Sequence, residues 1–362
     1  NGSICTKKQQ FKYGNYKSEW DKIDKLENEG KTKTALESIE SILNRARNEN
    51  NTAQVIKSLF HKYKYQMLIE EESTSKIVAD LKLNIEKTNG VEKALLQSIL
   101  GEMLNQYYIN NSYQFADRTN VDSIALADDF MTWDQKRFND ESRKLFAASL
   151  EQASLLQNTD ISTISEILYY EGKKSGLRPT LYDFLAHRAI DFYTNGDEIG
   201  TDEFEVNSPE FFNIGTNFSS FKITASRNYY GTYEALLVYQ NLVDFRTKKN
   251  DIPALIALEL KRLAFVYENS ISPDVLELLL KSYNELANKY ESNGAVAEVY
   301  FKIAQIINGK GVVTDSNGVE TNNHKKALEL CETTIKKYPS TDGATNCEAL
   351  KTSIQNPILS II

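Results

Sequence analysis

Long hydrophobic runs, proline, glycine and clustered basic residues are all scarce in this chain of 362 residues. No apolar stretch approaches the roughly 18 residues that a membrane-spanning helix needs. Only 6 Pro and 16 Gly are present, too few for a sandwich or barrel with many tight turns. The net charge of −8 argues against a nucleic-acid partner, since phosphate binding needs clustered Lys and Arg. With 41% hydrophobic and 25% charged residues, the remainder is ordinary globular sequence that can bury a large core.

Residues that carry metal or thiol chemistry are also few. The chain has three cysteines and three histidines, and no cysteine pair shows C-x-x-C spacing or lies near a histidine. We therefore expect no metal site. Cys331 and Cys347 lie on successive predicted helices. They can form a disulfide if those helices are antiparallel neighbours in an oxidising compartment. Two separately buried thiols are the alternative interpretation.

No motif in the sequence indicates a catalytic or cofactor site. The chain contains no phosphate-binding G-x-x-x-x-G-K-[ST] loop, no H-E-x-x-H and no EF-hand loop. Asp183 and His187 stand one helical turn apart beside Arg188, and could form an oriented general base. We interpret them instead as a polar ridge on an otherwise apolar helix, and expect neither catalytic residues nor a cofactor. The pairs Tyr107-Tyr108 and Tyr229-Tyr230 could stack on sugars, although packing is the simpler interpretation.

A helical hairpin is the unit on which the chain is built, and its clearest copy runs from Trp20 to Ala46. Apolar residues at helical spacing are interrupted by Gly30 and then resume with Ala35 and Leu36. Each apolar face is too narrow to be buried alone, so two helices must close on each other and on a neighbouring pair. A Gly followed five residues later by Ala, with apolar residues beyond, is the tetratricopeptide pattern.

Similar hairpins recur along the chain and predict an all-α fold. We expect a right-handed α-solenoid of tetratricopeptide-like hairpins over residues 19–356, after a polar leader at 1–18. Residues 194–226 lack a clear period and predict an irregular excursion, which is also a point of possible subdivision. Residues 357–362 read as the first strand of a following β-rich domain. In the middle of the chain, Thr132 is predicted to cap a helix, and residues 142–156 carry one long apolar stripe.

The last hairpin matches the tetratricopeptide template well. Tyr300, Ile303, Ala304 and Ile307 occupy its first helix, and Ala327, Cys331, Thr334 and Pro339 its second. These residues stand at the spacings that the template expects. The connection between the helices is longer than the template's, so Gly309–Asn323 is predicted to be an inserted loop.

Three blocks of sequence resemble the N-terminal region of alpha-2-macroglobulin-like proteins from Bacteroidetes. They are EWDKIDKLENEGKTKTALE at Glu19–Glu37, the helix start Thr132-Trp133-Asp134, and RPTLYDFLAHRAIDFY at Arg178–Tyr193. In that family a helical region precedes a string of β-sandwich macroglobulin domains. The resemblance implies a periplasmic or cell-surface protein, secreted with a signal peptide that is not part of this sequence, in a protein of the protease-inhibitor type.

The resemblance does not extend to the family's reactive group. Trapping macroglobulins carry a C-x-E-Q thioester, and none of Cys5, Cys331 and Cys347 begins such a motif. The implied function is therefore a non-catalytic scaffold that docks a protein partner or braces the following β-sandwich domains. Two alternatives stay open. One is a surface glycan-binding solenoid of the tetratricopeptide-containing, starch-binding type. The other is an all-α toroid glycosidase, which needs paired carboxylates in a tyrosine-rich cleft.

Overall fold

Helices make up nearly all of the computed structural model, which describes residues 15–71, 73–114, 129–168, 176–195, 204–225 and 231–356. The predicted all-α class is confirmed. The chain divides into two compact units, Asn1–Ala189 and Ile190–Ile362. The boundary falls inside one helix, α8 (Leu181–Asn195), shortly before the segment predicted to be irregular. The predicted strand at 357–362 lies outside the described residues.

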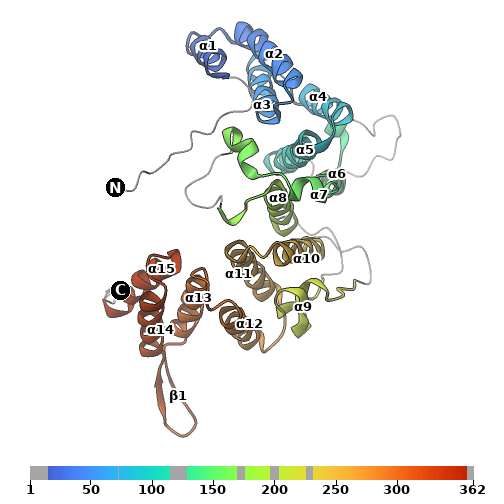
Figure 1. Ribbon diagram of the computed structural model, residues 1–362. Helices are drawn as coiled ribbons and strands as arrows, with labels where there is room; N and C mark the ends of the chain where they lie inside the picture. The colour runs from blue at the N-terminus through green and yellow to red at the C-terminus, as the bar shows by residue number, and fades with distance from the viewer. Residues whose placement is uncertain are drawn as a thin grey trace, which may run out of the picture. The chain divides into compact units, whose positions relative to one another are not determined.

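From α1 to α6, each α-helix of the first unit packs on the next α-helix along the chain (Figure 1). The short helix η4 returns to lie against α3. The elements before α8 are α1 (Lys17–Asn28), α2 (Thr32–Asn48), α3 (Thr52–Ile69), α4 (Ser73–Lys87), α5 (Gly90–Asn111), η1 (Ser112–Gln114), η3 (Phe130–Thr132), α6 (Gln135–Ala148), α7 (Ala153–Gln157) and η4 (Ile161–Ile167).

The hairpin predicted between Trp20 and Ala46 is present as α1 and α2. Gly30 joins them with a φ of +69°, in the left-handed region that favours glycine. Most of the stripe predicted on α2 is buried, with Ala35 and Ala46 fully inaccessible, whereas Leu36 is only half-buried. The hairpin is tied to α3 by the Trp20 indole, which donates to Oε1 of Gln54 over 2.7 Å. The indole nitrogen therefore keeps a partner inside the core.

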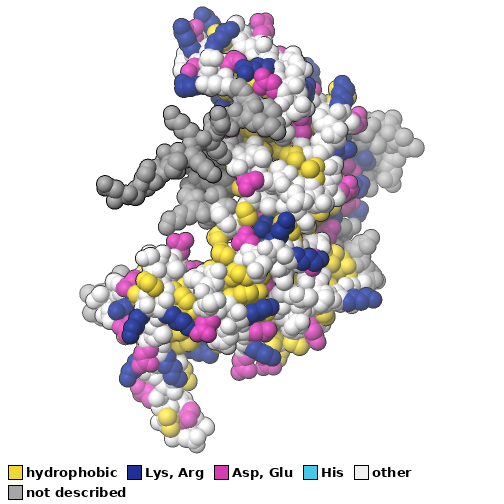
Figure 2. All heavy atoms as spheres, in the orientation of Figure 1, with side chains coloured by type: hydrophobic (Ala, Val, Ile, Leu, Met, Phe, Trp, Pro, Cys, Tyr) yellow, Lys and Arg dark blue, Asp and Glu magenta, His cyan; other side chains and the backbone are white. Residues whose placement is uncertain are grey.

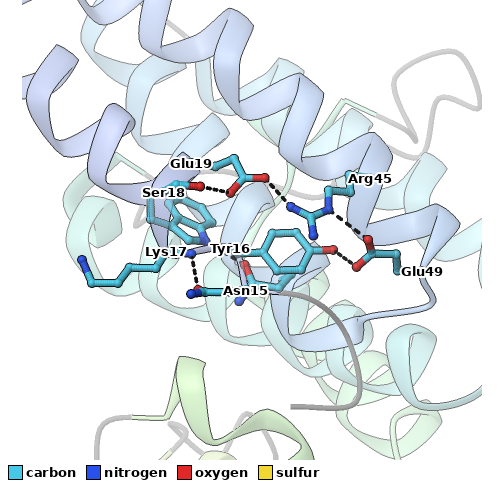
Figure 3. A network of polar contacts seen from close by, with 9 residues as sticks. Asn15, Tyr16, Lys17, Ser18, Glu19, Arg45 and Glu49 are labelled. Carbon is cyan, nitrogen blue, oxygen red and sulfur yellow. Dashed lines mark hydrogen bonds and ion pairs between the residues drawn. The ribbon is translucent and has the colours of Figure 1, made fainter. Parts of the chain in front are cut away.

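A polar network closes the start of the first unit (Figure 3). The Tyr16 hydroxyl donates to Glu49 over 2.6 Å, and Arg45 donates to the same carboxylate over 2.9 Å. Arg45 also pairs with Glu19 and lies 4.1 Å from the centre of the Tyr16 ring. These contacts hold the pKa of Glu49 below its usual range, chiefly through the Tyr16 hydrogen bond. Helix α1 begins at Lys17, inside the segment predicted as a polar leader.

Two local predictions in the first unit were wrong. Thr132 does not cap the helix that follows it, because residues 130–132 form a 3-10 turn. Asp134 caps α6 instead, and its carboxylate accepts from the Arg137 amide over 2.8 Å. The apolar stripe predicted across 142–156 is broken by a turn between α6 and α7. The prediction for Thr132 failed because the carboxylate of Asp134, two residues further on, is also a favourable N-cap group and occupies that position.

The second unit is again a series of helices in which consecutive members pack together, and α13 also touches α15 (Figure 1). Its core includes fully buried Leu263, Leu242 and Val299. Its elements after α8 are η6 (Pro209–Phe212), α9 (Thr216–Ser219), α10 (Thr232–Lys249), α11 (Ile252–Asn269), α12 (Val275–Lys289), α13 (Val296–Gly309), β1 (Val312–Thr314), β2 (Glu320–Asn322), α14 (Asn323–Lys337) and α15 (Asp342–Gln355).

The inserted connection at Gly309–Asn323 is more ordered than a loop. Strands β1 and β2 pair antiparallel within it, with Val312 opposite Asn322. The last hairpin packs tightly where α15 begins. A methyl group added at Gly343 would lie 2.2 Å from the backbone of Ala297. Only glycine allows α15 to approach the start of α13 this closely.

Candidate functional site

An apolar groove on the first unit is the most distinctive surface feature of the described chain. It has a volume of about 710 Å³ and is walled by α3, α4, α5, η4 and α8. Hydrophobic side chains reach the surface over α5 in Figure 2. Its large apolar lining residues include Phe60, Met67, Leu68, Leu81, Ile99, Met103, Leu168 and Phe184. Ligand sites of roughly 300–1,000 Å³ lined mainly by such residues are the usual concave binding sites of proteins.

The groove exists because α3 is apolar on more than one side. Phe60, Met67 and Leu68 are 48%, 53% and 67% exposed, although a side chain of this kind usually lies in the core. They are spaced so that they share one side of the helix. The buried residues of the helix, Val55, Ile56, Leu59 and Tyr63, continue the same face on one side, and Ile56 and Tyr63 also line the groove. Helix α3 therefore has one wide apolar face, part of which the described residues leave open to solvent.

Charged groups stand among the apolar lining residues. Lys64 lies between Phe60 and Met67 on α3 and pairs with Glu27. Arg188 of α8 donates from Nε to the Ser98 hydroxyl over 2.8 Å. The lining thus includes two cations, Lys64 and Arg188, and one carboxylate, Glu102. An occupant with acid groups on its flank is favoured by this balance.

Methionine is concentrated in the groove. The chain has 3 methionines, and two of them, Met67 and Met103, are lining residues. The third, Met131, lies elsewhere in the same unit and accepts a contact from the Tyr107 hydroxyl. Methionine side chains are unbranched and polarisable, and they are used where an apolar surface must adapt to its partner.

A polar hollow of about 530 Å³ lies in the second unit. It is bordered by Tyr193, Tyr239 and Phe265 together with amide and charged side chains. Lys261 spans one edge and pairs with Asp191 over 2.8 Å. Tyr193 and Tyr239 are only 6% and 1% exposed, so their ring faces are already covered. The hollow offers hydrogen-bonding groups but little free aromatic surface.

A buried charge cluster in the second unit was not among the predicted features. Glu259 and Arg262, one turn apart on α11, are fully buried and pair over 2.6 Å. Arg262 donates to the carbonyls of Phe211 and Asn213 over 2.7 Å each. Its guanidinium also lies 3.8 Å from the centre of the Phe218 ring. Glu259 accepts from the Gly215 amide over 2.7 Å.

This cluster fastens the irregular segment 204–225 onto α11. A segment without regular structure must satisfy its backbone groups in some other way, and here buried side chains do so. Two further side chains add to the same effect: Ser282 donates to the Phe212 carbonyl, and Gln240 to those of Phe218 and Phe221. Every charged group in the cluster has a partner within the unit, which indicates a structural role.

On α8, the Asp183 side chain of the predicted polar ridge forms a helix cap. The Asp183 carboxylate accepts from the Thr180 amide over 3.0 Å and from the Thr180 hydroxyl over 2.7 Å. In return the Asp183 amide donates to the Thr180 hydroxyl, which completes a reciprocal helix cap. Asp183 and His187 are buried and are not among the lining residues of the groove, whereas Arg188 is.

The other two blocks that resemble the macroglobulin-like family lie in packed positions as well. Trp20 is buried in the first hairpin. Trp133 is buried against Phe138, with a centroid distance of 5.4 Å, and Lys82 lies over its ring. The pair Tyr107-Tyr108, considered above for sugar stacking, packs on the same Phe138 ring. The pair Tyr229-Tyr230 lies outside the described residues.

The comparisons with known proteins add no relative. No protein-family model matches the chain, and no similar curated protein was found. Within the described ranges, no group of three or more His, Cys, Asp or Glu side chains is arranged to hold a metal ion. No described helix is both long and apolar enough to cross a lipid bilayer.

Proposed function

We propose that this chain is a non-catalytic helical scaffold whose first unit binds an amphipathic helix of a protein partner in the apolar groove. The observation that carries the proposal is the open part of the wide apolar face of α3, where Phe60, Met67 and Leu68 stay exposed. Exposed apolar surface of this kind is costly in water unless it is covered in a complex. The right-handed solenoid of hairpins remains part of the same proposal, because such stacks offer extended surfaces to partners.

The chemistry of the groove favours a helix as its occupant. Its walls are helices, and an amphipathic helix inserts side chains at i, i+3, i+4 and i+7 into such a surface. Met67 and Met103 can adjust to the shape of the inserted side chains. The cations Lys64 and Arg188 favour acidic residues along the flank of the helix.

A catalytic role has less support. Acid–base cleavage of a glycosidic bond needs two carboxylates across the substrate. The groove has a single lining carboxylate, Glu102, and the polar hollow likewise has one, Glu268. The Asp183 carboxylate is engaged by Thr180 as a helix cap. These features support the non-enzymatic interpretation over the toroid glycosidase.

The three sequence blocks support placing the scaffold at the N-terminus of an alpha-2-macroglobulin-like cell-envelope protein, periplasmic or surface-exposed. The partner helix would then belong to another protein or to the same envelope assembly. Sequencing the gene beyond the codon for Ile362 tests this placement. Codons for β-rich macroglobulin domains support it, and an unrelated continuation contradicts it.

Binding is tested with a fluorescent amphipathic peptide of about 18 residues, five helical turns, with a leucine stripe and glutamate flanks. Anisotropy titrations should give saturable binding that Leu68→Asp weakens at least tenfold. Leu83→Asp is the matched control, because Leu83 is 45% exposed on the same unit but does not line the groove. Equal binding by wild type and Leu68→Asp, or no binding at all, would contradict the proposal. Lysine flanks should bind more weakly than glutamate flanks.

Glycan binding is the second candidate, and the polar hollow of the second unit is the observation that favours it. Asn195, Asn269 and Glu268 offer hydrogen-bonding groups around it. Calorimetry with soluble polysaccharides decides the matter. Heat of binding that is lost in Asn269→Ala would make glycan recognition the better proposal.

A further inference from the structure

The two buried cysteines of the second unit lie in the same core cluster. Cys331 of α14 and Cys347 of α15 are both fully buried thiols in one small cluster with Ala304 of α13. The helices are neighbours joined by the short connection 338–341. These relations meet the structural part of the condition for a disulfide, and an oxidising environment is the other part.

We propose that Cys331 and Cys347 form an intramolecular disulfide during oxidative folding, which locks the α14–α15 hairpin. Two thiols in one small core cluster, on packed neighbouring helices, can be brought to the S–S bond length of about 2.05 Å by side-chain movement. The cysteine cluster is independent of the groove, so the disulfide and the docking proposal stand or fall separately.

The oxidant is a disulfide, either oxidised glutathione or the disulfide of an oxidoreductase. One cysteine thiolate attacks it, which forms a mixed disulfide and releases one thiol. The second cysteine thiolate then attacks the protein sulfur of the mixed disulfide and releases the second thiol. The protein loses two protons and two electrons, and the oxidant is reduced to two thiols. Because both sulfurs are fully buried in the folded unit, these steps take place before the hairpin closes.

Refolding the full chain tests the proposal in a Cys5→Ser background, which removes the remaining thiol. Reduced, denatured protein is refolded with a mixture of reduced and oxidised glutathione. We expect a mass lower by two hydrogens and a tryptic peptide that joins Cys331 to Cys347. The thermal midpoint of the second unit should rise by roughly 5–10 °C relative to the reduced form, since a short loop is closed in the unfolded chain.

The control is Cys347→Ser in the same background, which should show neither the linked peptide nor the rise. Recovery of two free thiols in refolded protein, measured after denaturation, would overturn the proposal. An oxidised form that melts below the reduced form would overturn it as well, because it would mean that the hairpin does not accommodate the bond.

Discussion

The two units depart in different ways from the usual pattern of buried apolar and exposed charged side chains. The first unit gathers large exposed apolar side chains along one groove, including Leu68 at 67% exposure. The second unit buries an ion pair, Glu259 and Arg262, completely. The buried charges have all their partners inside the unit, which indicates that they stabilise the fold. The exposed apolar surface of the groove is not covered by other parts of the described chain, which indicates that it binds a partner.

The surface charges do not separate the two units in this way. On the face shown in Figure 2, Lys and Arg side chains are interspersed with Asp and Glu over both units. Neither sign forms a broad field on that face. The contrast between the units therefore rests on burial rather than on net charge.

The largest effect is expected from breaking the buried cluster. Arg262→Ala removes the partner of Glu259 and of two backbone carbonyls, and should destabilise the second unit by about 3–5 kcal/mol. Urea unfolding with hydrogen exchange over 209–219 measures it. The control is Lys261→Ala on the preceding residue, whose partly exposed pair with Asp191 is worth at most about 1 kcal/mol. Equal losses for both variants would show that the cluster does not hold the segment.

A smaller loss is expected where α15 approaches α13. Gly343→Ala places a methyl group 2.2 Å from backbone atoms that cannot move away cheaply. Such overpacking should destabilise the last hairpin by about 1–3 kcal/mol. Gly309→Ala is the matched control, because an added methyl group there meets nothing within 4 Å. It should be neutral or stabilising. Thermal unfolding of both variants separates the two outcomes, and a neutral Gly343→Ala would refute the close approach.

A pH effect should distinguish the first unit. Burial lowers the pKa of His61, and the nearby cations Lys57 and Lys64 lower it further. The folded state therefore binds this proton less readily than the unfolded state, whose histidine has a pKa near 6.5. The stability from neutral His61 is present above that value and is lost as pH falls through the lower folded pKa.

Tryptophan fluorescence measures this effect, since both tryptophans of the chain, Trp20 and Trp133, lie in the first unit. Trp20 is 4.8 Å from the His61 ring. The denaturant concentration at the midpoint of unfolding should decrease as the pH is lowered from about 7 to about 5. This range lies above that in which ordinary carboxyl groups titrate. His61→Phe should flatten that slope. An unchanged slope in the variant would show that another group is responsible.

The smallest effect on stability is expected at the groove itself. Leu68→Asp changes a side chain that is already 67% exposed, so the free energy of unfolding should stay within about 0.5 kcal/mol of wild type. Denaturant titration checks this. A loss as large as that for Arg262→Ala would mean that Leu68 serves the core of the first unit instead of a partner.

The helices could be predicted from the sequence better than the exposed groove or the buried charge cluster. The repeating apolar stripes were sufficient to predict the all-α class, because helical periodicity is a local property of the sequence. Gly30, which interrupts such a stripe, located the turn of the first hairpin. The groove left a signal that a single-stripe interpretation overlooks. From Val55 to Leu68 the apolar residues of α3 spread over about 220° of the helix, which is wider than one neighbour covers.

The buried cluster left a signal as well. At 100° per residue, Glu259 and Arg262 fall in the middle of the apolar face made by Leu255, Leu258 and Leu263. Charges in that position need buried partners. Those partners are the carbonyls of Phe211 and Asn213, some fifty residues earlier and in a segment without a period. No local pattern could identify them, because the pairing depends on the tertiary fold.

Methyl NMR of the three methionines tests the central claim most directly. Met67 and Met103 line the groove, and Met131 is an internal control in the same unit. The full chain is labelled with ¹³C-methyl methionine and titrated with the glutamate-flanked amphipathic peptide. We predict that the methyl signals of Met67 and Met103 shift together and saturate, while that of Met131 stays in place. A bound peptide that leaves Met67 and Met103 unmoved would contradict the assignment of the groove as the docking site.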